Sequence, residues 1–189
     1  NNLEFKLYNS NPLIRNPWNS FVIADPSVLT PDIAHDGKFH LFCHTFFGVH
    51  HYISNNGVGF KKQGKIVNRA MRPNINYIDG KYYLSWVCHT DRGTSIGIAV
   101  TEDFINWDRK ENAVLPVSRN GVLFPRKVNN EYMIFTRPCD KGHTPYGDIF
   151  LSHSPDLTYW GKHRFVIKPE NNWEMTKVGA GPTPIETDE

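Results

Sequence analysis

The chain has 189 residues, which is enough for one ordinary domain with a sizeable core. Its 21 basic and 19 acidic residues give a net charge of +2, which argues neither for nor against a polyanionic partner. The content of 5 Trp, 8 Tyr and 12 Phe suits β-structure and sugar binding equally. No apolar run reaches the roughly 18 residues that a membrane-spanning helix requires, so we expect no membrane partner.

The amino-terminal residues and the cysteines indicate in which cellular compartment the protein is expected. The first four residues, Asn1–Glu4, have neither a basic head nor an apolar stretch, so no signal peptide is visible, although a processed precursor stays open because the chain does not begin with Met. Cys43, Cys88 and Cys139 are an odd number without close pairing, and we expect them to be reduced and mostly buried. The cytoplasm is therefore the predicted location.

The chain divides into a lead-in and a series of similar passes. Residues 1–20 are rich in Asn and Pro and are predicted to form an extended lead-in. Residues 21–68, 69–119 and 120–176 follow one pattern, and residues 177–189 begin a fourth pass. Each complete pass holds short strands bounded by Asn, Gly, Pro and Asp, which is typical of an all-β protein.

Turn signals locate the strands. Asp36-Gly37, Asp79-Gly80 and, more loosely, Asn129-Asn130 are expected to form tight hairpin turns between apolar segments. The strands predicted around these turns are 38–45, 51–54, 81–90, 96–100, 124–127, 132–135 and 149–152.

These repeats predict a β-propeller. A four-stranded unit that recurs about every 40 to 50 residues cannot bury its faces alone, so it packs against its neighbours around a central channel. Trp107 and Trp160 end matching passes and are predicted to lie in the core, whereas Trp18, Trp86 and Trp173 are candidates for stacking on a sugar ring. Because the fourth pass stops at a first hairpin turn, we expect a fragment, or a second chain that completes the ring.

Five short motifs follow one another in the second half of the chain: Leu123–Lys127, Thr136–Pro138, Gly147–Ile149, Ser154–Leu157 with Trp160-Gly161, and Lys177–Pro182. Together they resemble glycoside hydrolase family 130, the mannoside phosphorylases and related hydrolases, from about Asp79 to Ile185. The resemblance implies a five-bladed β-propeller, of which about three and a half blades are present. It also implies an active site at the mouth of the channel, with β-mannosides as the substrate class.

The usual mechanism of the family, as the resemblance implies it, is inverting. An Asp at the start of the second blade acts as the acid, and in the phosphorylases phosphate attacks the anomeric carbon. The matching position here is Arg72, within Met71–Asn74, and a guanidinium cannot donate a proton at neutral pH. The chain therefore departs from the usual mechanism. We expect no cofactor, with inorganic phosphate as co-substrate if the protein is a phosphorylase.

Asp25 is the predicted catalytic residue. Ala24-Asp25-Pro26 resembles the first-blade Asp-Pro of the wider five-bladed glycosidases that include family 43, where this Asp is the general base. In that group a later Glu-Gly-Pro supplies the acid, whereas this chain has Ala180-Gly181-Pro182. Glycoside hydrolysis usually needs two carboxyl groups, and Asp148 is the weaker second candidate. A plain turn or strand-start aspartate is the alternative for Asp25.

Arg72, Lys127, Arg137 and Asp148 are the predicted substrate-binding residues. Arg137 offers a bidentate fork and Lys127 a point charge for a phosphate or a sugar hydroxyl, and solvated charge at the rim is the alternative. Arg72 is expected to pair with Asp25 across the channel. For Asp148, binding a sugar hydroxyl and closing a loop are equal alternatives.

Histidines crowd the first pass, but no metal site is predicted. His40 and His44 would share one face of a strand, yet two ligands are too few and no carboxylate completes a known spacing. Cys43–Thr45 recurs as Cys88–Thr90, so the repeat explains His44 more simply, and His44 or His89 is a candidate hydrogen-bonding group in the channel. No phosphate loop or basic stripe is visible, so no nucleic-acid partner is expected.

The sequence thus predicts an enzyme that cleaves glycosidic bonds of β-mannoside-like oligosaccharides, by hydrolysis or by phosphorolysis. Two alternatives stay open. One is a non-catalytic carbohydrate-binding propeller that has lost the catalytic acid, and the other is a truncated fragment of an enzyme. The predicted partners are an oligosaccharide and a second chain or missing segment that completes the propeller.

Overall fold

The computed structural model describes residues 6–9, 11–15, 21–110, 112–139, 147–174 and 176–188. Strands and their connections make up nearly all of this part, and its one helical element is a 3₁₀ turn, η1 (Asn172–Glu174). None of the described helical structure has the length and apolar character needed to span a membrane. The predicted all-β class is confirmed.

The strands form three antiparallel sheets of four strands each, and every sheet uses strands that are consecutive in the chain. The first sheet contains β1 (Ile23–Leu29), β2 (Phe39–Thr45), β3 (Gly48–Ser54) and β4 (Lys61–Asn68). The second contains β5 (Ala70–Ile78), β6 (Lys81–Thr90), β7 (Gly93–Thr101) and β8 (Asp108–Arg109). The third contains β9 (Ser118–Leu123), β10 (Tyr132–Pro138), β11 (Ile149–Ser154) and β12 (Gly161–Ile167).

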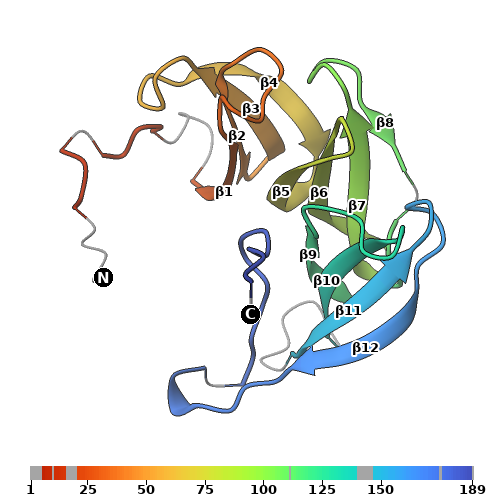
Figure 1. Ribbon diagram of the computed structural model, residues 1–189. Coiled ribbons are helices and arrows are strands. Elements are labelled where there is room, and N and C mark those ends of the chain that lie inside the picture. Colours follow the sequence, from red (N-terminus) through yellow and green to blue (C-terminus); the bar gives the residue numbers. More distant parts are fainter. Residues whose placement is uncertain are drawn as a thin grey trace.

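The sheets follow one another in an arc, with β1, β5 and β9 on its inner side and β4, β8 and β12 on its outer side (Figure 1). The carboxy-terminal segment, residues 177–186, lies inside the arc in dark blue. The Nδ2 of Asn120, near the start of β9, donates to Ala180 O at 3.0 Å, and beyond the end of β9 Arg126 Nε donates to Glu186 Oε2 at 2.8 Å. The segment therefore runs parallel to β9 on the inner side of the arc.

Tight turns join the first two strands of the second and third sheets. Asp79 and Gly80 have φ values of 48° and 84°, and Asn129 and Asn130 have values of 51° and 63°. Positive φ at both central residues is the type I′ pattern, which follows the twist of the flanking strands. The turns predicted at these two places are confirmed.

The connection between the third and fourth strands repeats one hydrogen-bonded turn in all three sheets. A hydroxyl at the end of the third strand accepts the backbone N–H two residues later. The side-chain Oδ1 of that later residue accepts the N–H groups two and three positions further on. The pairs are Ser54 and Asn56, Thr101 and Asp103, and Ser154 and Asp156. These bonds give hydrogen-bond partners to backbone N–H groups of the connection. Their recurrence in all three sheets shows that the same structural unit is repeated three times.

Some strand predictions differ from the observed sheets. The strand predicted at 124–127 is wrong, because β9 ends at Leu123 and the following residues connect to β10. Pro125 has no N–H to donate to a strand partner. The outer strands β4 and β12 were not predicted. Most of their residues are exposed, and their sequences lack the alternation of apolar and polar residues that indicates a half-buried strand.

The hydrophobic core lies between neighbouring sheets. One cluster joins the first and second sheets around Phe42 and Trp86, and a second joins the second and third sheets around Leu123 and Ile134. The second sheet thus buries both faces against its neighbours, and the first and third sheets bury one face each. This dependence on neighbours explains why a single unit would not be stable alone.

Trp86 is fully buried, so its prediction as a sugar-stacking residue is wrong. Its indole lies against Gly97 of β7, where an added Cβ would come within 2.4 Å of the ring. Trp107 and Trp160 pack against the two clusters, as predicted. Trp173 is exposed, and Trp18 lies outside the described residues.

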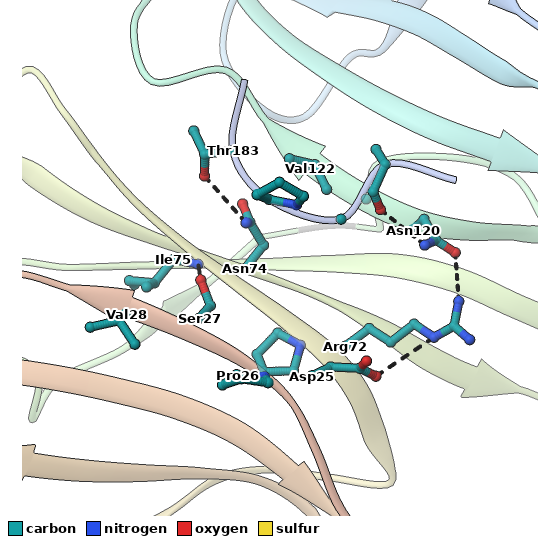
Figure 2. A pocket seen from close by; sticks show the side chains of 15 residues that line it. Asp25, Pro26, Ser27, Val28, Arg72, Asn74, Ile75, Asn120, Val122 and Thr183 are labelled. Carbon is teal, nitrogen blue, oxygen red and sulfur yellow. Dashed lines mark hydrogen bonds and ion pairs between the residues drawn. The ribbon is translucent and has the colours of Figure 1, made fainter. Parts of the chain in front are cut away.

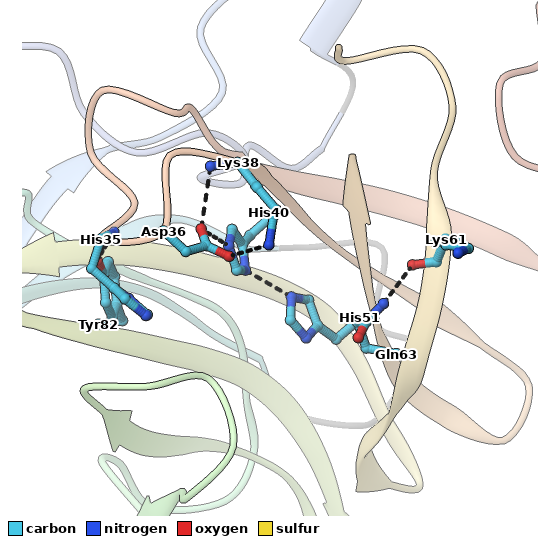
Figure 3. A network of polar contacts seen from close by, with 8 residues as sticks. All are labelled: His35, Asp36, Lys38, His40, His51, Lys61, Gln63 and Tyr82. Atoms are coloured by element: carbon cyan, nitrogen blue, oxygen red, sulfur yellow. Dashed lines mark hydrogen bonds and ion pairs between the residues drawn. The ribbon is translucent and has the colours of Figure 1, made fainter. Parts of the chain in front are cut away.

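A polar network in the first sheet lies against the second sheet (Figure 3). Asp36 Oδ1 lies 2.9 Å from His40 Nε2, and His40 Nδ1 lies 2.9 Å from His51 Nε2. Phe104 of the second sheet stacks on His40, with ring centroids 3.8 Å apart. Burial lowers the pKa of His51 to about 4 and also lowers the pKa of His40, so both imidazoles are neutral at pH 7. The described residues contain no cluster of His, Cys, Asp or Glu that could hold a metal ion.

We expect the free energy of unfolding to fall as the pH falls from about 6.5 to about 4. An unfolded histidine has a pKa near 6.5, whereas folded His51 has a pKa of about 4, so in this interval protons bind preferentially to the unfolded chain. His51 alone should cost about 2 kcal/mol between pH 7 and pH 5.

Urea unfolding at pH 7 and at pH 5 measures this difference. His51→Gln should reduce the pH dependence, while His89→Gln, which alters an exposed imidazole, should leave it unchanged. An identical pH dependence in His51→Gln and the unmodified protein would contradict the assignment.

Candidate functional site

The innermost strand of each sheet carries an irregularity in its pairing near its start. The register between the first and second strands shifts at this point in all three sheets. The residues inside the irregularities have left-handed backbone: Asp25 (φ 50°), Arg72 (φ 52°) and Asn120 (φ 58°). This conformation is uncommon for residues with a side chain. A bulge of this kind redirects a side chain out of the regular alternation of a strand.

The three redirected side chains line one pocket of about 740 Å³ (Figure 2). Its walls come from β1, β5 and β9 and from Ala180–Thr183 of the carboxy-terminal segment. The volume lies within the range of small-molecule sites, about 300 to 1,000 Å³. Segments from four separate parts of the chain therefore meet at one place on the inner side of the arc.

Arg72 lies at the centre of a row of polar contacts. Its Nε is 3.8 Å from Asp25 Oδ2, and its Nη1 donates to Asn120 Oδ1 at 2.7 Å. Asn120 in turn holds the carbonyl of Ala180. The expected pairing of Arg72 with Asp25 is present, and the row connects the first, second and third sheets with the carboxy-terminal segment.

His44 of β2 is the second neighbour of Asp25. Its Nδ1 lies 3.3 Å from Asp25 Oδ2 and accepts the backbone N–H of Arg72, also at 3.3 Å. Burial lowers the pKa of His44, although the charge of Asp25 acts in the opposite sense, so the imidazole is neutral at pH 7. His44 thus holds the irregular segment of β5 beside Asp25 through the N–H of Arg72, and its accepting Nδ1 has no proton to donate to the carboxylate.

Two further guanidinium groups, those of Arg137 and Arg119, lie near Arg72, although neither lines the pocket. Arg137 of β10 packs so closely under Gly147 and Gly179 that an added Cβ would lie 2.8 Å from its Cδ and 2.7 Å from its Nη1, respectively. Burial lowers the pKa of Arg137, and the charges of Arg72 and Arg119 lower it further. Arg119 is 7% exposed, and its Nε has no hydrogen-bond partner among the described residues. Three neighbouring guanidinium groups suit an anionic ligand.

Another wall of the pocket is closed by amide and hydroxyl groups. Thr183 Oγ1 donates to Asn76 Oδ1 at 2.8 Å and accepts a bond from Asn74 Nδ2 at 3.3 Å. Asn76 Nδ2 donates to Asn74 Oδ1 at 2.6 Å. These bonds fasten the carboxy-terminal segment to β5.

Two predicted binding residues lie apart from this pocket. Lys127 sits in the connection from β9 to β10, where its Nζ is 3.1 Å from Asp79 Oδ2 and 4.6 Å from the ring centroid of Tyr132. That connection is at the opposite end of the third sheet from Asn120. Asp148 directly precedes β11 and does not line the pocket. Most of the loop between Arg137 and Asp148 lies outside the described residues.

Sequence reasoning did not single out Arg119, Asn120 and Thr183. Asn120-Gly121 stands where the earlier passes carry Asp25-Pro26 and Arg72-Pro73. Aligning the three passes at these dipeptides would have found Asn120. Thr183 carries no such signal, because its contacts with Asn74 and Asn76 depend on how the carboxy-terminal segment crosses the pocket.

Residues 45–189 match the model of glycoside hydrolase family 130, described as beta-1,4-mannooligosaccharide phosphorylase. The chain belongs to this family. The family match begins before the expected start near Asp79, so it includes the whole second sheet and Arg72.

Two relatives illustrate the range of family 130. The beta-1,4-mannooligosaccharide phosphorylase of Ruminococcus albus is 43% identical over an alignment of 148 positions that covers 75% of this chain and 44% of that protein. The 1,2-beta-oligomannan phosphorylase of a Thermoanaerobacter species is 29% identical over an alignment of 201 positions, gaps included, that covers 93% of this chain and 64% of that protein. The chain thus spans less than two thirds of the length of either relative.

Solved structures share the fold. The beta-1,2-mannobiose phosphorylase of Listeria innocua, in complex with beta-1,2-mannobiose, superposes with a TM-score of 0.79 at 18% identity, over 96% of this chain and 72% of that one. A thermostable family-43 glycoside hydrolase gives 0.66 at 16% identity, over 81% and 55%. The chain therefore has the propeller-type all-β architecture of families 130 and 43.

The left-handed backbone at Asp25 yields a stability prediction. Asp25→Asn should change the free energy of unfolding by less than about 0.5 kcal/mol, because Asn tolerates positive φ well. Asp25→Val should cost about 1 to 2 kcal/mol, because a β-branched side chain is strained there.

Urea unfolding of both variants measures the two effects. The control is Ala24→Val, one residue earlier at ordinary φ, which should cost less than Asp25→Val. Equal destabilisation by Asn and Val at position 25 would contradict the role assigned to the backbone.

Proposed function

We propose that this protein cleaves β-mannosides in the pocket between β1, β5, β9 and the carboxy-terminal segment, with Asp25 as its catalytic carboxylate. The observation that carries this proposal is the convergence on one pocket of Asp25, Arg72 and Asn120 from three successive sheets. Membership of family 130 and the name of the Ruminococcus albus relative support β-mannosyl oligosaccharides as the substrate.

The chemistry of the pocket suits a sugar. The carboxylate of Asp25 and the amide of Asn120 can exchange hydrogen bonds with hydroxyl groups. Val28, Ile75 and Val122 supply apolar wall against which the C–H groups of a pyranose ring can pack. A few polar groups set in an apolar wall are typical of small-molecule sites.

Phosphorolysis is the favoured reaction, because Arg72, Arg119 and Arg137 gather positive charge beside the pocket. A hydrogen phosphate dianion held there would attack the anomeric carbon, and the bond from that carbon to the glycosidic oxygen would break. The products would be mannose 1-phosphate and the shortened saccharide, and the proton of the hydrogen phosphate would balance the hydroxyl group formed on the departing oxygen. Inorganic phosphate is then a co-substrate. Arg72 is proposed to contact sugar or phosphate, and Lys127 and Asp148 are proposed to bind parts of the substrate outside the central pocket.

Asp25 is proposed to act as a base or as an orienting carboxylate. Its side chain is half exposed to the pocket, so it can take a proton from the nucleophile or hold a sugar hydroxyl. The departing oxygen also needs a proton, and Arg72 cannot supply it. Asp25 is the one carboxylate that lines the pocket in the described part of the chain. The presence of one carboxylate where glycoside hydrolysis usually needs two favours a second candidate function, carbohydrate binding without cleavage.

The three sheets and the carboxy-terminal segment support a five-bladed ring, with blades at 21–68, 69–119 and 120–176 and the start of a fourth at 177–189. A further segment or a second chain would complete it. The share of the relatives' length that this chain covers agrees with this proposal. Cys43, Cys88 and Cys139 are free, which supports a reducing compartment such as the cytoplasm.

Turnover tests the proposal directly. The protein is incubated with β-1,4-mannobiose, with and without inorganic phosphate, and the release of mannose 1-phosphate and of mannose is followed. We expect phosphate-dependent release, and Asp25→Asn should lower its rate by about 10²- to 10⁴-fold. Asp32→Asn, an exposed carboxylate outside the pocket, is the control and should retain activity. Binding of mannobiose without turnover would favour the second candidate function.

Phosphate binding can be tested without turnover. Phosphate should raise the unfolding temperature, since a ligand that binds only the folded state stabilises it, by about 2.7 kcal/mol at 100 times its dissociation constant. Arg137→Ala should reduce this phosphate-dependent rise. Lys127→Ala should retain it, because Lys127 is at the other end of the third sheet. Loss of the rise in Lys127→Ala but not in Arg137→Ala would contradict this view of the phosphate site.

A further inference from the structure

The hairpin between β2 and β3 ends in an aromatic pair. Thr45 pairs with Gly48, so Phe46 and Phe47 form the tip of the turn. Phe46 is 76% exposed and Phe47 is 43% exposed, with ring centroids 5.8 Å apart in an edge-on arrangement. Turn tips usually carry Gly, Asn, Asp or Ser, which makes two phenylalanines at this position unusual.

The fold does not require aromatic residues at this position. The equivalent hairpin of the second sheet pairs Thr90 with Gly93, and its tip is Asp91-Arg92. The same turn is therefore built with two charged residues one sheet later. Exposing a large aromatic ring to water is unfavourable, and exposed apolar groups beside a site commonly mark a binding surface.

The aromatic tip lies at the same end of the first sheet as Asp25. In the pairing of β1 with β2, Ile23 faces Thr45 and Ala24 faces His44. Phe46 lies one residue beyond this pairing. The tip of the hairpin therefore stands next to the end of β1 where Asp25 enters the pocket.

A second hollow, of about 380 Å³, lies between the first two sheets at this end. Phe46, Arg69, Met71 and His89 line it together with His44. His44 is also the imidazole that lies 3.3 Å from the Asp25 carboxylate. His44 lines the second hollow and Asp25 lines the central pocket, so the two hollows are adjacent through this pair of residues.

The lining has the chemistry of a carbohydrate subsite. The ring of Phe46 offers an apolar face for the C–H groups of a pyranose. The exposed side chains of Arg69 and His89 offer N–H donors for its hydroxyl groups. A flat apolar surface beside N–H donors is the combination that a pyranose ring, with its C–H face and its hydroxyl groups, can use.

We propose that the hollow lined by Phe46, Arg69 and His89 is an additional sugar subsite, which binds further mannosyl units of an oligosaccharide whose reacting end occupies the central pocket. This inference rests on the proposed function, because it takes β-mannosides as the ligand. It adds a preference for chain length: the central pocket holds the bond to be cleaved, and the aromatic hairpin selects longer substrates.

The test compares the dissociation constants of β-1,4-mannobiose and β-1,4-mannotetraose, measured by calorimetry on the full chain. The tetraose should bind more tightly than the biose to the unmodified protein. Phe46→Ala should weaken tetraose binding by about three- to tenfold and leave the biose unchanged. Phe46→Trp keeps a ring and should retain the preference. Tyr159→Ala removes an aromatic ring of similar exposure, 74%, from the connection between β11 and β12 and should change neither constant.

The possible results separate this inference from the proposed function. If the unmodified protein binds both sugars equally, or if Phe46→Ala weakens both or neither, the additional subsite is refuted while the central site stands. If the unmodified protein binds neither sugar, the proposed function fails and the subsite fails with it. A loss of the length preference in Phe46→Ala, with retention in Phe46→Trp and Tyr159→Ala, supports the subsite.

Discussion

The left-handed residue near the start of each innermost strand is the constraint on which the candidate site depends. In a regular strand, side chains alternate between the two faces of the sheet, and the faces between successive sheets are filled by the core clusters. The irregularities at Asp25, Arg72 and Asn120 break this alternation and turn one side chain per sheet toward the inside of the arc. Because the same irregularity occurs in each of the three sheets, three different chemical groups meet in one pocket: a carboxylate, a guanidinium and an amide.

The contacts among these groups hold the sheets in their relative positions. Arg72 reaches Asp25 on one side and Asn120 on the other, and His44 holds the backbone of Arg72. The carboxy-terminal segment depends on the same groups, through Asn120 and through the amides of β5. Arg72 therefore has a structural role, because it bridges neighbouring sheets at the pocket, beside the carboxylate of Asp25.

Features set by local sequence were predictable, and features set by contacts between repeats were not. The turns at Asp79-Gly80 and Asn129-Asn130 follow from residues that accept positive φ, and the repeat of such units indicated the all-β class. Trp86 was assigned to the wrong environment because burial between sheets depends on Gly97 of the neighbouring strand. Lys127 follows a motif of the family, yet its position is set by Asp79 in another sheet. Asp25 and Arg72 were found because each stands before a proline at a position that resembles a motif of a known glycosidase family, whereas Asn120 has no such resemblance.

The central claim is that the pocket beside Asp25 holds the reacting bond. A crystal structure of the Asp25→Asn variant with β-1,4-mannobiose and inorganic phosphate tests it most directly, because this substitution keeps the left-handed backbone and slows turnover. We expect the glycosidic bond within hydrogen-bonding distance of the side chain at position 25, and the phosphate against the guanidinium groups of Arg72 and Arg137. A mannobiose bound elsewhere on the protein, with this pocket holding neither sugar nor phosphate, would contradict the claim.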